Sequence, residues 1–127
     1  LCGAITFEVK GTLPPLTACH CTQCRKHSGH YEVSVDIPRS SLSINGAEKI
    51  TWYKSQKARR GFCLTCGSSL FWDPLDKKKH DWTAVAMGAF DGPTQTKLTQ
   101  HIFTDDKGDY YEITDKLPQI PSPALAT

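Results

Sequence analysis

Three cysteines lie within six residues of one another, a density that side-chain packing does not require. They are Cys19, Cys21 and Cys24, and two more, Cys63 and Cys66, stand in C-x-x-C spacing further along. Thiolates are soft ligands that suit Zn²⁺, and C-x-C and C-x-x-C spacings let one turn of backbone present two sulfurs to one ion. The sequence therefore predicts metal binding through thiolates.

Two groupings of the cysteines are open. In the first, two C-x-x-C pairs, Cys21 with Cys24 and Cys63 with Cys66, hold one structural ion, and the other two cysteines have no role. The spacing between these pairs is longer than in the usual zinc ribbon, although an inserted β-hairpin would absorb it. The first grouping also gives no reason for a third thiol in C-x-C spacing.

The second grouping uses all six cysteines. One ion is bound by three sulfurs and keeps an open position, which is the usual pattern of a catalytic zinc, and a second ion takes the remaining three. The two sets are Cys19, Cys21 and Cys24, and Cys2, Cys63 and Cys66.

The alternative of three disulfides is disfavoured. Cys19 and Cys21 are too close in sequence to pair without strain, and disulfide frameworks usually belong to shorter chains that are denser in cysteine. Metal binding by free thiols indicates a reducing compartment, and we expect a cytoplasmic protein. The only methionine is Met87, so we expect that a segment precedes Leu1, and an N-terminal targeting peptide is not excluded.

The composition and charge of the chain limit the classes of partner that we expect. The 127 residues are 39% hydrophobic and 22% charged, which is typical of a soluble globular chain. The formal net charge of +2 is too small to indicate nucleic-acid binding, and Lys77–Lys79, flanked by acidic residues, is interpreted as a solvated loop. No apolar stretch approaches the ~20 residues that a membrane-spanning helix needs.

Apolar residues alternate with polar ones along much of the chain, which predicts short strands in a mainly antiparallel β fold. Turn signals separate these segments at Asn45-Gly46, Asp73-Pro74, Asp91-Gly92-Pro93 and Lys107-Gly108-Asp109. The expected strands include residues 5–9, 33–37, 42–44, 50–53, 70–72, 82–87, 101–103 and 110–113.

One short helix is expected directly after the first cysteines. Thr22 is suited to cap a turn that runs to His27, and Gly29 is suited to end it. Cys24 would then lie in the first helical turn, where the helix dipole favours a thiolate. Residues 1–117 are expected to form one domain, and residues 118–127, rich in proline, an extended tail.

The run CHCTQCRKHSG, from Cys19 to Gly29, resembles the zinc motif of the glutathione-dependent formaldehyde-activating (GFA) family. The resemblance extends over almost the whole chain in the family's order. Further matching segments are Cys2–Ile5, Phe62–Ser68, Gly88–Asp91, His101–Phe103, Tyr110–Ile113 and Asp115–Pro118.

The resemblance implies the β-tent fold of that family and two zinc ions per full-length chain. One is a catalytic zinc on Cys19, Cys21 and Cys24; the other is structural, on Cys2, Cys63, Cys66 and a further cysteine. The family's first motif is C-x-C-G, and this sequence starts inside it at Leu1-Cys2-Gly3. We therefore expect the fourth structural ligand immediately before Leu1.

The resemblance also implies an activity, that of a zinc-dependent carbon–sulfur lyase acting on glutathione adducts. In the family's named reaction, glutathione and formaldehyde give S-hydroxymethylglutathione, and a related small carbonyl or electrophile is an alternative substrate. Arg25, Lys26 and Ser28 are candidate glutathione contacts, and His20, His27 and His30 are candidate proton donors by nearness in sequence. Two other functions stay open: a non-enzymatic zinc-binding protein-interaction module, and a redox or metal-buffering role for the three-cysteine motif.

Overall fold

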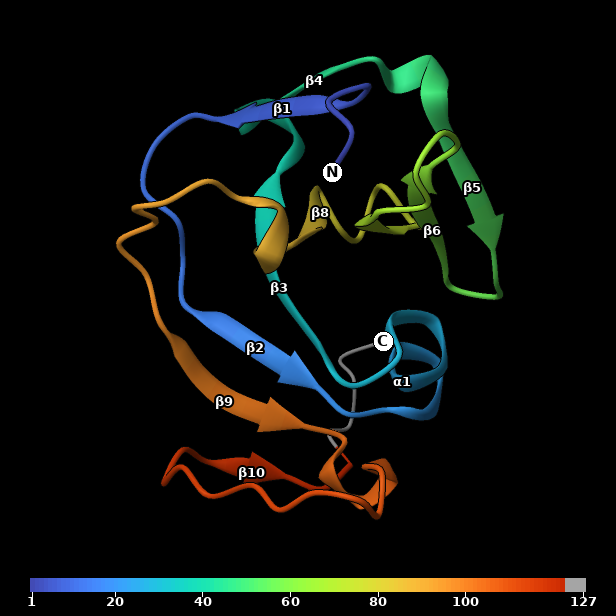
Figure 1. The fold of residues 1–127 in the computed structure, drawn as a ribbon. Helices are drawn as coiled ribbons and strands as arrows, with labels where there is room; N and C mark the ends of the chain where they lie inside the picture. The colour runs from blue at the N-terminus through green and yellow to red at the C-terminus, as the bar shows by residue number, and fades with distance from the viewer. Residues whose placement is uncertain (123–127) are drawn as a thin grey trace. The chain divides into compact units, whose positions relative to one another are not determined.

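The computed structural model describes residues 1–122, which form two compact units (Figure 1). The first unit consists of Leu1–Pro14 and Val35–Gln95, and the second of Pro15–Ser34 and the chain from Thr96 onward. Strand β3 (Glu32–Pro38) begins in the second unit and ends in the first. The expectation that residues 1–117 are one domain stays a prediction.

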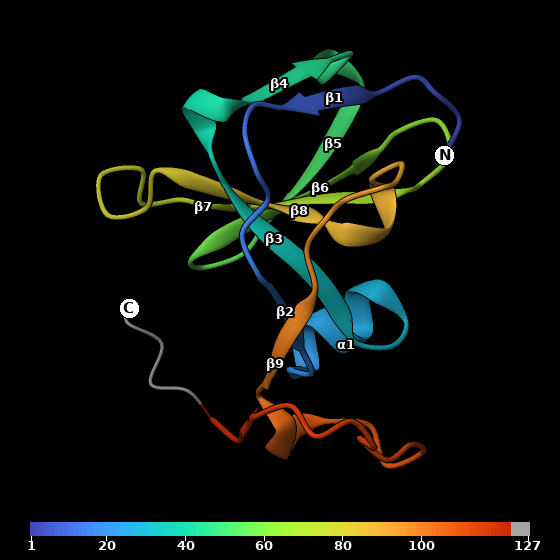
Figure 2. The ribbon, with the colours of Figure 1, turned by 90° about the vertical axis from the view of Figure 1, so that its left-hand side faces the viewer.

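The first unit contains four antiparallel strands in the order β5-β6-β7-β8. A separate antiparallel pair, β1 with β4, places Phe7 opposite Ile44 (Figure 2). The strands of this unit are β1 (Thr6–Val9), β4 (Leu42–Asn45), β5 (Ile50–Lys54), β6 (Ala58–Cys63), β7 (Ser69–Pro74) and β8 (Trp82–Ala86). The short 3-10 helices η1 (Arg39–Ser41), η2 (Ala47–Lys49) and η3 (Met87–Ala89) connect them.

Aromatic side chains join the two sheets of the first unit. The Phe7 ring meets those of Phe71 and Phe90 edge to face, with centroids 6.0 and 5.0 Å apart. Trp52 stacks on the same Phe71, which is 2% exposed. Edge-to-face and stacked pairs of this kind add to the free energy gained by burying their apolar area. This core holds β1 against β7, which pairs with β6, the strand that ends at Cys63.

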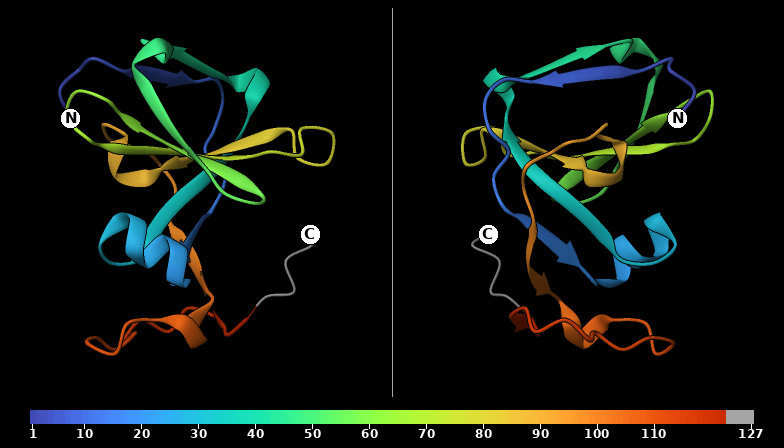
Figure 3. Two further views of the ribbon diagram at one scale, coloured as in Figure 1. Left: turned by 90° about the vertical axis from the view of Figure 1, so that its right-hand side faces the viewer. Right: turned by 60° about the vertical axis from the view of Figure 1, so that its left-hand side comes forward.

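In the second unit, β2 (Leu16–Cys19) lies between the start of β3 and β9 (Leu98–Ile102), antiparallel to the first and parallel to the second. The two-residue β10 (Gln119–Ile120) continues the sheet parallel to β9. The one α-helix of the described residues, α1 (Thr22–Ser28), follows β2 and leads back into β3 (Figure 3). A 3-10 turn, η4 (Thr104–Asp106), follows β9.

The predicted fold class, mainly β with one short helix after the three-cysteine motif, is confirmed. The helix ends as expected at Gly29, which has a φ of 89° and donates its backbone N–H to the Arg25 carbonyl. β10 lies within the predicted tail 118–127, of which residues 123–127 lie outside the described part of the chain. Among the described residues, no helix is long and apolar enough to cross a membrane.

Three expectations for single elements are wrong. Residues 110–113 form no strand, because their polar groups bind side chains instead; the Tyr111 carbonyl, for example, accepts a bond from Lys107 Nζ. Asp73-Pro74 is the end of β7 and not a turn, since Asp73 and Pro74 pair with Arg59 and Ala58 of β6. The helix cap is Cys21 and not Thr22.

Candidate functional site

The structure gathers the six cysteines into two groups of three. Within each group the three sulfur atoms lie within 4.8 Å of one another, and among residues 1–122 neither group is joined by a fourth candidate ligand. All six thiols are free of disulfides. The groups are triad A, which is Cys2, Cys63 and Cys66, and triad B, which is Cys19, Cys21 and Cys24. These are the two sets of the second predicted grouping; their role as metal ligands stays a prediction.

Triad A belongs to the first unit. Cys63 is the last residue of β6, and Cys66 lies in the turn that follows, where Gly67 has a φ of 76° and closes the turn with a 2.8 Å bond from its N–H to the Cys63 carbonyl. Such a φ favours glycine. Cys2 comes from the segment before β1, and its sulfur lies 3.7 Å from that of Cys63.

Backbone N–H groups of this turn favour thiolates. The N–H groups of Cys66 and Thr65 lower the pKa of the Cys63 thiol, the second lying 3.4 Å from the sulfur. The N–H of Ser68 is the main cause that lowers the pKa of Cys66, to about 6. For Cys2, the Ala4 N–H lowers the pKa, but the two neighbouring thiols and burial outweigh it and raise the pKa.

Triad B belongs to the second unit and lies at the junction of β2 and α1. Cys19 is the last residue of β2, Cys21 caps the helix, and Cys24 is buried in the first helical turn. The Cys21 sulfur accepts the backbone N–H of Cys24 at 3.3 Å, which satisfies one of the free N–H groups of the helix start.

The three thiols of triad B share their protons unequally. Hydrogen bonds from Cys19 and Cys24 lower the pKa of Cys21 to about 2, because both neighbours and the helix start donate to its sulfur. The bond to Cys21 in turn raises the pKa of Cys19 to about 12, and bonds to Cys19 and Cys21 raise the pKa of Cys24. Without metal, the triad therefore holds one thiolate, at Cys21, and two thiols.

Both triads fit zinc in donor type and spacing. Sulfurs bound to one tetrahedral zinc at ~2.3 Å stand roughly 3.8 Å apart, and Cys2 and Cys63 are separated by 3.7 Å. Sulfur as the sole donor favours a soft ion over Mg²⁺ or Ca²⁺. The residues present therefore fit zinc at both triads. A fourth protein ligand would make the site structural, and an open fourth position would suit a catalytic zinc.

The candidate glutathione contacts lie on α1 and differ in their surroundings. Arg25 is half-buried, and its Nε atom is buried without a hydrogen-bond partner. Lys26 is exposed. The Ser28 hydroxyl donates to the Cys24 carbonyl at 2.7 Å, so its proton is engaged within the helix. Arg25 therefore carries a buried donor without a partner, whereas the ammonium of Lys26 is exposed.

A buried polar network lies beside triad B, and the sequence did not predict it. His20, between Cys19 and Cys21, has no exposed surface; its Nδ1 bonds the Tyr111 hydroxyl and its Nε2 lies 2.8 Å from Nδ1 of His101. His101 Nε2 in turn lies 2.9 Å from the Asp115 carboxylate. Burial, followed by the charge of His101, lowers the pKa of His20 to about 4, so His20 is neutral at pH 7.

The other candidate proton donors have separate surroundings. Nδ1 of His30 bonds the Tyr110 hydroxyl at 2.6 Å, and His27 is half-buried on α1. Spacing alone cannot find the His20 network, because His20 is more than 80 residues from His101 and Tyr111 in sequence. The hint in the sequence was that His101, Tyr111 and Asp115 fall in segments singled out by resemblance.

The model of the family described as glutathione-dependent formaldehyde-activating enzyme matches residues 1–106. This chain belongs to that family. Both triads and the His20–His101 pair fall inside the matched residues. Tyr111 and Asp115 lie after them.

One protein sequence and one crystal structure are also similar to this chain. The chain is 29% identical over 118 residues to a Schizosaccharomyces pombe protein named as an uncharacterized lyase, and the match covers 91% of this chain and 83% of that protein. A crystal structure of a Rhodobacter sphaeroides protein superposes with a TM-score of 0.58 at 23% identity. It covers 77% of this chain and 94% of that one, and at this identity it supports the fold alone.

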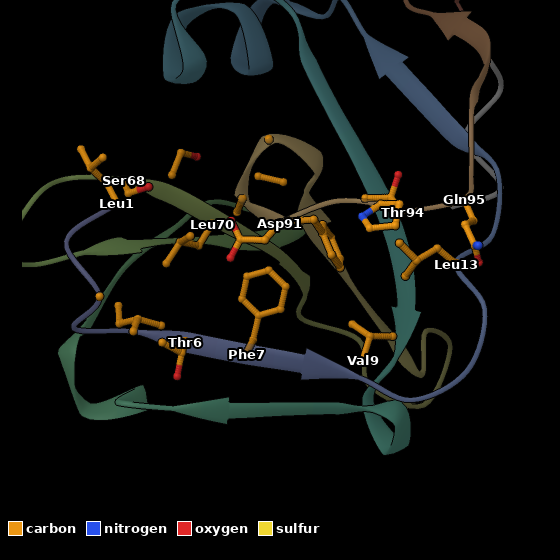
Figure 4. Close-up of a pocket in the computed structure, with 18 of the residues that line it drawn as sticks. Leu1, Thr6, Phe7, Val9, Leu13, Ser68, Leu70, Asp91, Thr94 and Gln95 are labelled. Carbon is orange, nitrogen blue, oxygen red and sulfur yellow. The ribbon is translucent and has the colours of Figure 1, made fainter.

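The first unit of this GFA-family chain also contains an open groove of about 1080 Å³ (Figure 4). Phe7 and Leu70 point toward Asp91 in its centre, and Leu1 and Ser68, neighbours in sequence of triad A, line one end. The groove was not predicted, because its lining comes from three separate segments of sequence, within residues 1–13, 68–70 and 86–95. Its wall is part apolar and part polar, with Thr94 and Gln95 at the end away from Leu1.

Proposed function

We propose that this chain is a zinc-dependent carbon–sulfur lyase of glutathione adducts, forming or cleaving S-hydroxymethylglutathione or the adduct of a related small electrophile. Membership of the GFA family supports the reaction class, and the lyase name of the Schizosaccharomyces pombe relative agrees with it. The observation that carries the proposal is triad B, in which three thiols and no fourth ligand among residues 1–122 converge on one point.

Bound zinc would supply a Lewis acid that holds a substrate thiol as thiolate. The chain's own residues build the position for it. Cys21, which accepts the Cys24 N–H, fixes the loop between β2 and α1, and buried His20 anchors the same loop through both ring nitrogens. Arg25, one residue after Cys24, is the proposed cation for a carboxylate of glutathione; it is half-buried, and its Nε has no partner.

The reaction makes or breaks one C–S bond and moves two protons, one at the glutathione sulfur and one at the oxygen of the aldehyde. In the forming direction, the glutathione sulfur loses its proton and attacks the aldehyde carbon; the C=O π electrons move to oxygen, which takes a proton. In the lyase direction the same C–S bond breaks and the protons return. Binding the thiol and the aldehyde side by side contributes to the rate acceleration, because the reaction no longer depends on a bimolecular encounter in solution.

For triad A we propose a structural role. Its thiols lie at the end of β6 and in a tight turn, where backbone N–H groups favour the thiolate form. With the cysteine expected before Leu1, the donor set would be four thiolates, which closes a zinc site. The proposed stoichiometry is therefore two zinc ions per full-length chain.

Metal content and turnover, measured on the full-length chain, test both roles. We expect two zinc ions in the parent, and one in Cys24→Ser and in Cys66→Ser. Cys24→Ser should abolish formation of S-hydroxymethylglutathione while circular dichroism and thermal unfolding stay close to those of the parent. Cys66→Ser should lower the unfolding temperature.

Zinc-edge X-ray absorption during a glutathione titration gives a readout besides turnover. We expect one additional sulfur neighbour per chain in the parent and none in Cys24→Ser. A parent that binds two zinc ions but gains no sulfur and shows no turnover at millimolar glutathione contradicts the proposed enzyme. That result would favour the non-enzymatic interaction module.

A further inference from the structure

Two adjacent arginines of β6 have opposite surroundings. Arg59 pairs with the Asp73 carboxylate at 2.8 Å, and its guanidinium lies 3.8 Å above the Trp52 ring. Arg60 is buried, with 5% of its surface exposed, and its Nε has no hydrogen-bond partner. Within residues 1–122, the side chain of Arg60 also forms no ion pair and no cation–π contact. The more deeply buried of the two cations is therefore the one without a counter-charge.

The pairing of the strands explains this difference. Successive side chains of a strand point to opposite faces of the sheet. The register places Arg59 opposite Asp73, and it places Arg60 on the other face, between residues of β5 and β7. The row of Arg60 across the four strands of the first unit is Tyr53, Arg60, Trp72 and Ala84. This row gives Arg60 aromatic neighbours and no carboxylate.

An unpaired cation at this position lowers the stability of the fold. A guanidinium stays charged in proteins, so Arg60 cannot lose its charge as a buried lysine can. Buried charges are normally paired, because a charge removed from water without a partner costs free energy. Strand β6 is paired on both sides, which prevents Arg60 from moving into solvent with its backbone. A bound anion would supply the partner that the described part of the chain does not.

The neighbours of Arg60 indicate which anion fits. Trp72 stacks on Trp82 with ring centroids 5.7 Å apart and an angle of 19° between the planes. Tyr53, on the last strand in the order of the sheet, is 63% exposed. Aromatic rings favour the apolar part of a ligand. The row has one cation, which balances the single charge of a carboxylate and not the double charge of a phosphate.

We propose that Arg60 binds the carboxylate of a small organic molecule whose apolar part lies against Trp72 and Tyr53. The planar guanidinium donates from Nε and from one terminal nitrogen to the two carboxylate oxygens, so the buried Nε gains a partner. The ligand enters from the exposed end of the row, at Tyr53. All these residues belong to the first unit, and the site is independent of the lyase reaction proposed for triad B.

NMR of the arginine Nε–H groups tests the site on the zinc-loaded full-length chain. The probe is 3-phenylpropionate, and its neutral analogue is 3-phenylpropionamide. We expect the carboxylate to shift the Arg60 Nε–H signal and leave that of Arg59 in place, whereas the amide should shift neither. Inorganic phosphate should bind at least about tenfold more weakly than 3-phenylpropionate, because one guanidinium leaves a phosphate charge unpaired.

Glutathione, which also carries carboxylates, distinguishes two sources of the ligand. A shift of Arg60 with both probes supports the site and identifies the proposed substrate as a source of the carboxylate. A shift with 3-phenylpropionate alone supports the site and assigns it to a separate ligand. If neither probe shifts the Arg60 signal, the proposed site is wrong. Turnover does not enter these measurements, so this failure would leave the proposed lyase untouched.

Arg60→Met and the matched variant Arg59→Met separate binding from structure. In Arg60→Met, the Kd for 3-phenylpropionate, measured by calorimetry, should rise at least about tenfold, because a charge-assisted hydrogen bond is lost. Its unfolding temperature without ligand should rise, since an unpaired buried charge is removed. Arg59→Met loses the Asp73 pair and the Trp52 contact, so its unfolding temperature should fall while the Kd stays within about twofold.

Arg60→Lys keeps the charge and removes the planar fork, and it should also weaken binding of 3-phenylpropionate. An unchanged Kd in both Arg60 variants would overturn the site. An unfolding temperature that falls in Arg60→Met, with binding retained, would show that this arginine has a structural role instead.

Discussion

Cys21 has two tasks that reinforce each other. Its sulfur caps α1 by accepting the Cys24 N–H, and the same bond, together with those from the neighbouring thiols, holds a negative charge at this position. A thiolate is also the form that binds metal. The residue that starts the helix is thus already ionised when an ion arrives, and we expect it to make the first contact.

This difference within triad B predicts selective alkylation of the metal-free chain. At pH 6, Cys21 is a half-exposed thiolate because its pKa is lowered to about 2, whereas Cys24 is buried and protonated because its pKa is raised. Iodoacetamide should therefore modify Cys21 well before Cys24, as peptide mapping by mass spectrometry would show. Zinc added beforehand should protect both, and early modification of Cys24 would contradict the assigned charges.

Arg25 and Lys26 are adjacent in sequence but differ in what they leave unsatisfied. The buried Nε of Arg25 has no partner, while Lys26 is exposed. We expect Arg25→Gln to raise KM for glutathione about tenfold, or ~1.4 kcal/mol, with little change in kcat, because a charge-assisted hydrogen bond is lost. Lys26→Gln is the matched control and should leave KM within about twofold. Equal effects of the two changes would indicate a general electrostatic attraction instead.

At the scale of single elements, the sequence was informative where side chains face a core and uninformative where they bind one another. The strands β1, β3, β4 and β5 were predicted because apolar residues alternate along them. Strand β6 was missed, since the ARRG segment shows no such alternation. Its Arg59 stacks on Trp52 at 3.8 Å and pairs with Asp73, two contacts that only the strand pairing creates.

Asp73 joins β6, β7 and β8 of the first unit through polar contacts. Its carboxylate pairs with Arg39, Arg59 and Lys77 at 2.7, 2.8 and 2.5 Å and accepts the Thr83 hydroxyl at 2.9 Å. Burial alone would raise the pKa of Asp73, but these bonds outweigh it and hold the pKa well below its usual range. The ionised carboxylate therefore stabilises the folded first unit.

We expect Asp73→Asn to lower the free energy of unfolding by about 2 kcal/mol at pH 7, because three cations lose the carboxylate that they share. The three cations are partly exposed to solvent, so this loss is smaller than for a fully buried ion pair. A depressed folded-state pKa stabilises above the unfolded value of about 3.9 and loses its effect as pH falls below it. The difference between parent and variant, measured by urea unfolding, should thus shrink below pH 4. Asp81→Asn, an exposed neighbour, is the control and should match the parent throughout.

At the scale of the whole molecule, each triad draws its ligands from one unit. Triad B comes from a stretch of six residues, so sequence spacing predicted it directly. Triad A needs Cys2 to return to a turn more than 60 residues away; the grouping that uses all six cysteines predicted this set, and the family resemblance agreed with it. The His20 network joins His20 to residues more than 80 positions away, and the resemblance marked their segments without indicating that they meet. A motif within a few residues can be recognised from the sequence, whereas a site assembled by strand pairing can be identified only when the fold is known.

Because the triads belong to different units, loss of the two proposed zinc ions should have separable consequences. On treatment of the full-length zinc-loaded chain with a chelator, triad B should release its ion first, since three thiolates and an open position bind less firmly than a closed four-thiolate site. Hydrogen–deuterium exchange should then rise in residues 15–34 and 96–120, and only later in residues 58–74. In Cys24→Ser, which should bind no zinc at triad B, the chelator should cause no early rise in exchange. The later rise in residues 58–74 should be the same as in the parent. Simultaneous loss of protection in both sets of residues would show that the units fold as one cooperative body and that the metals do not act independently.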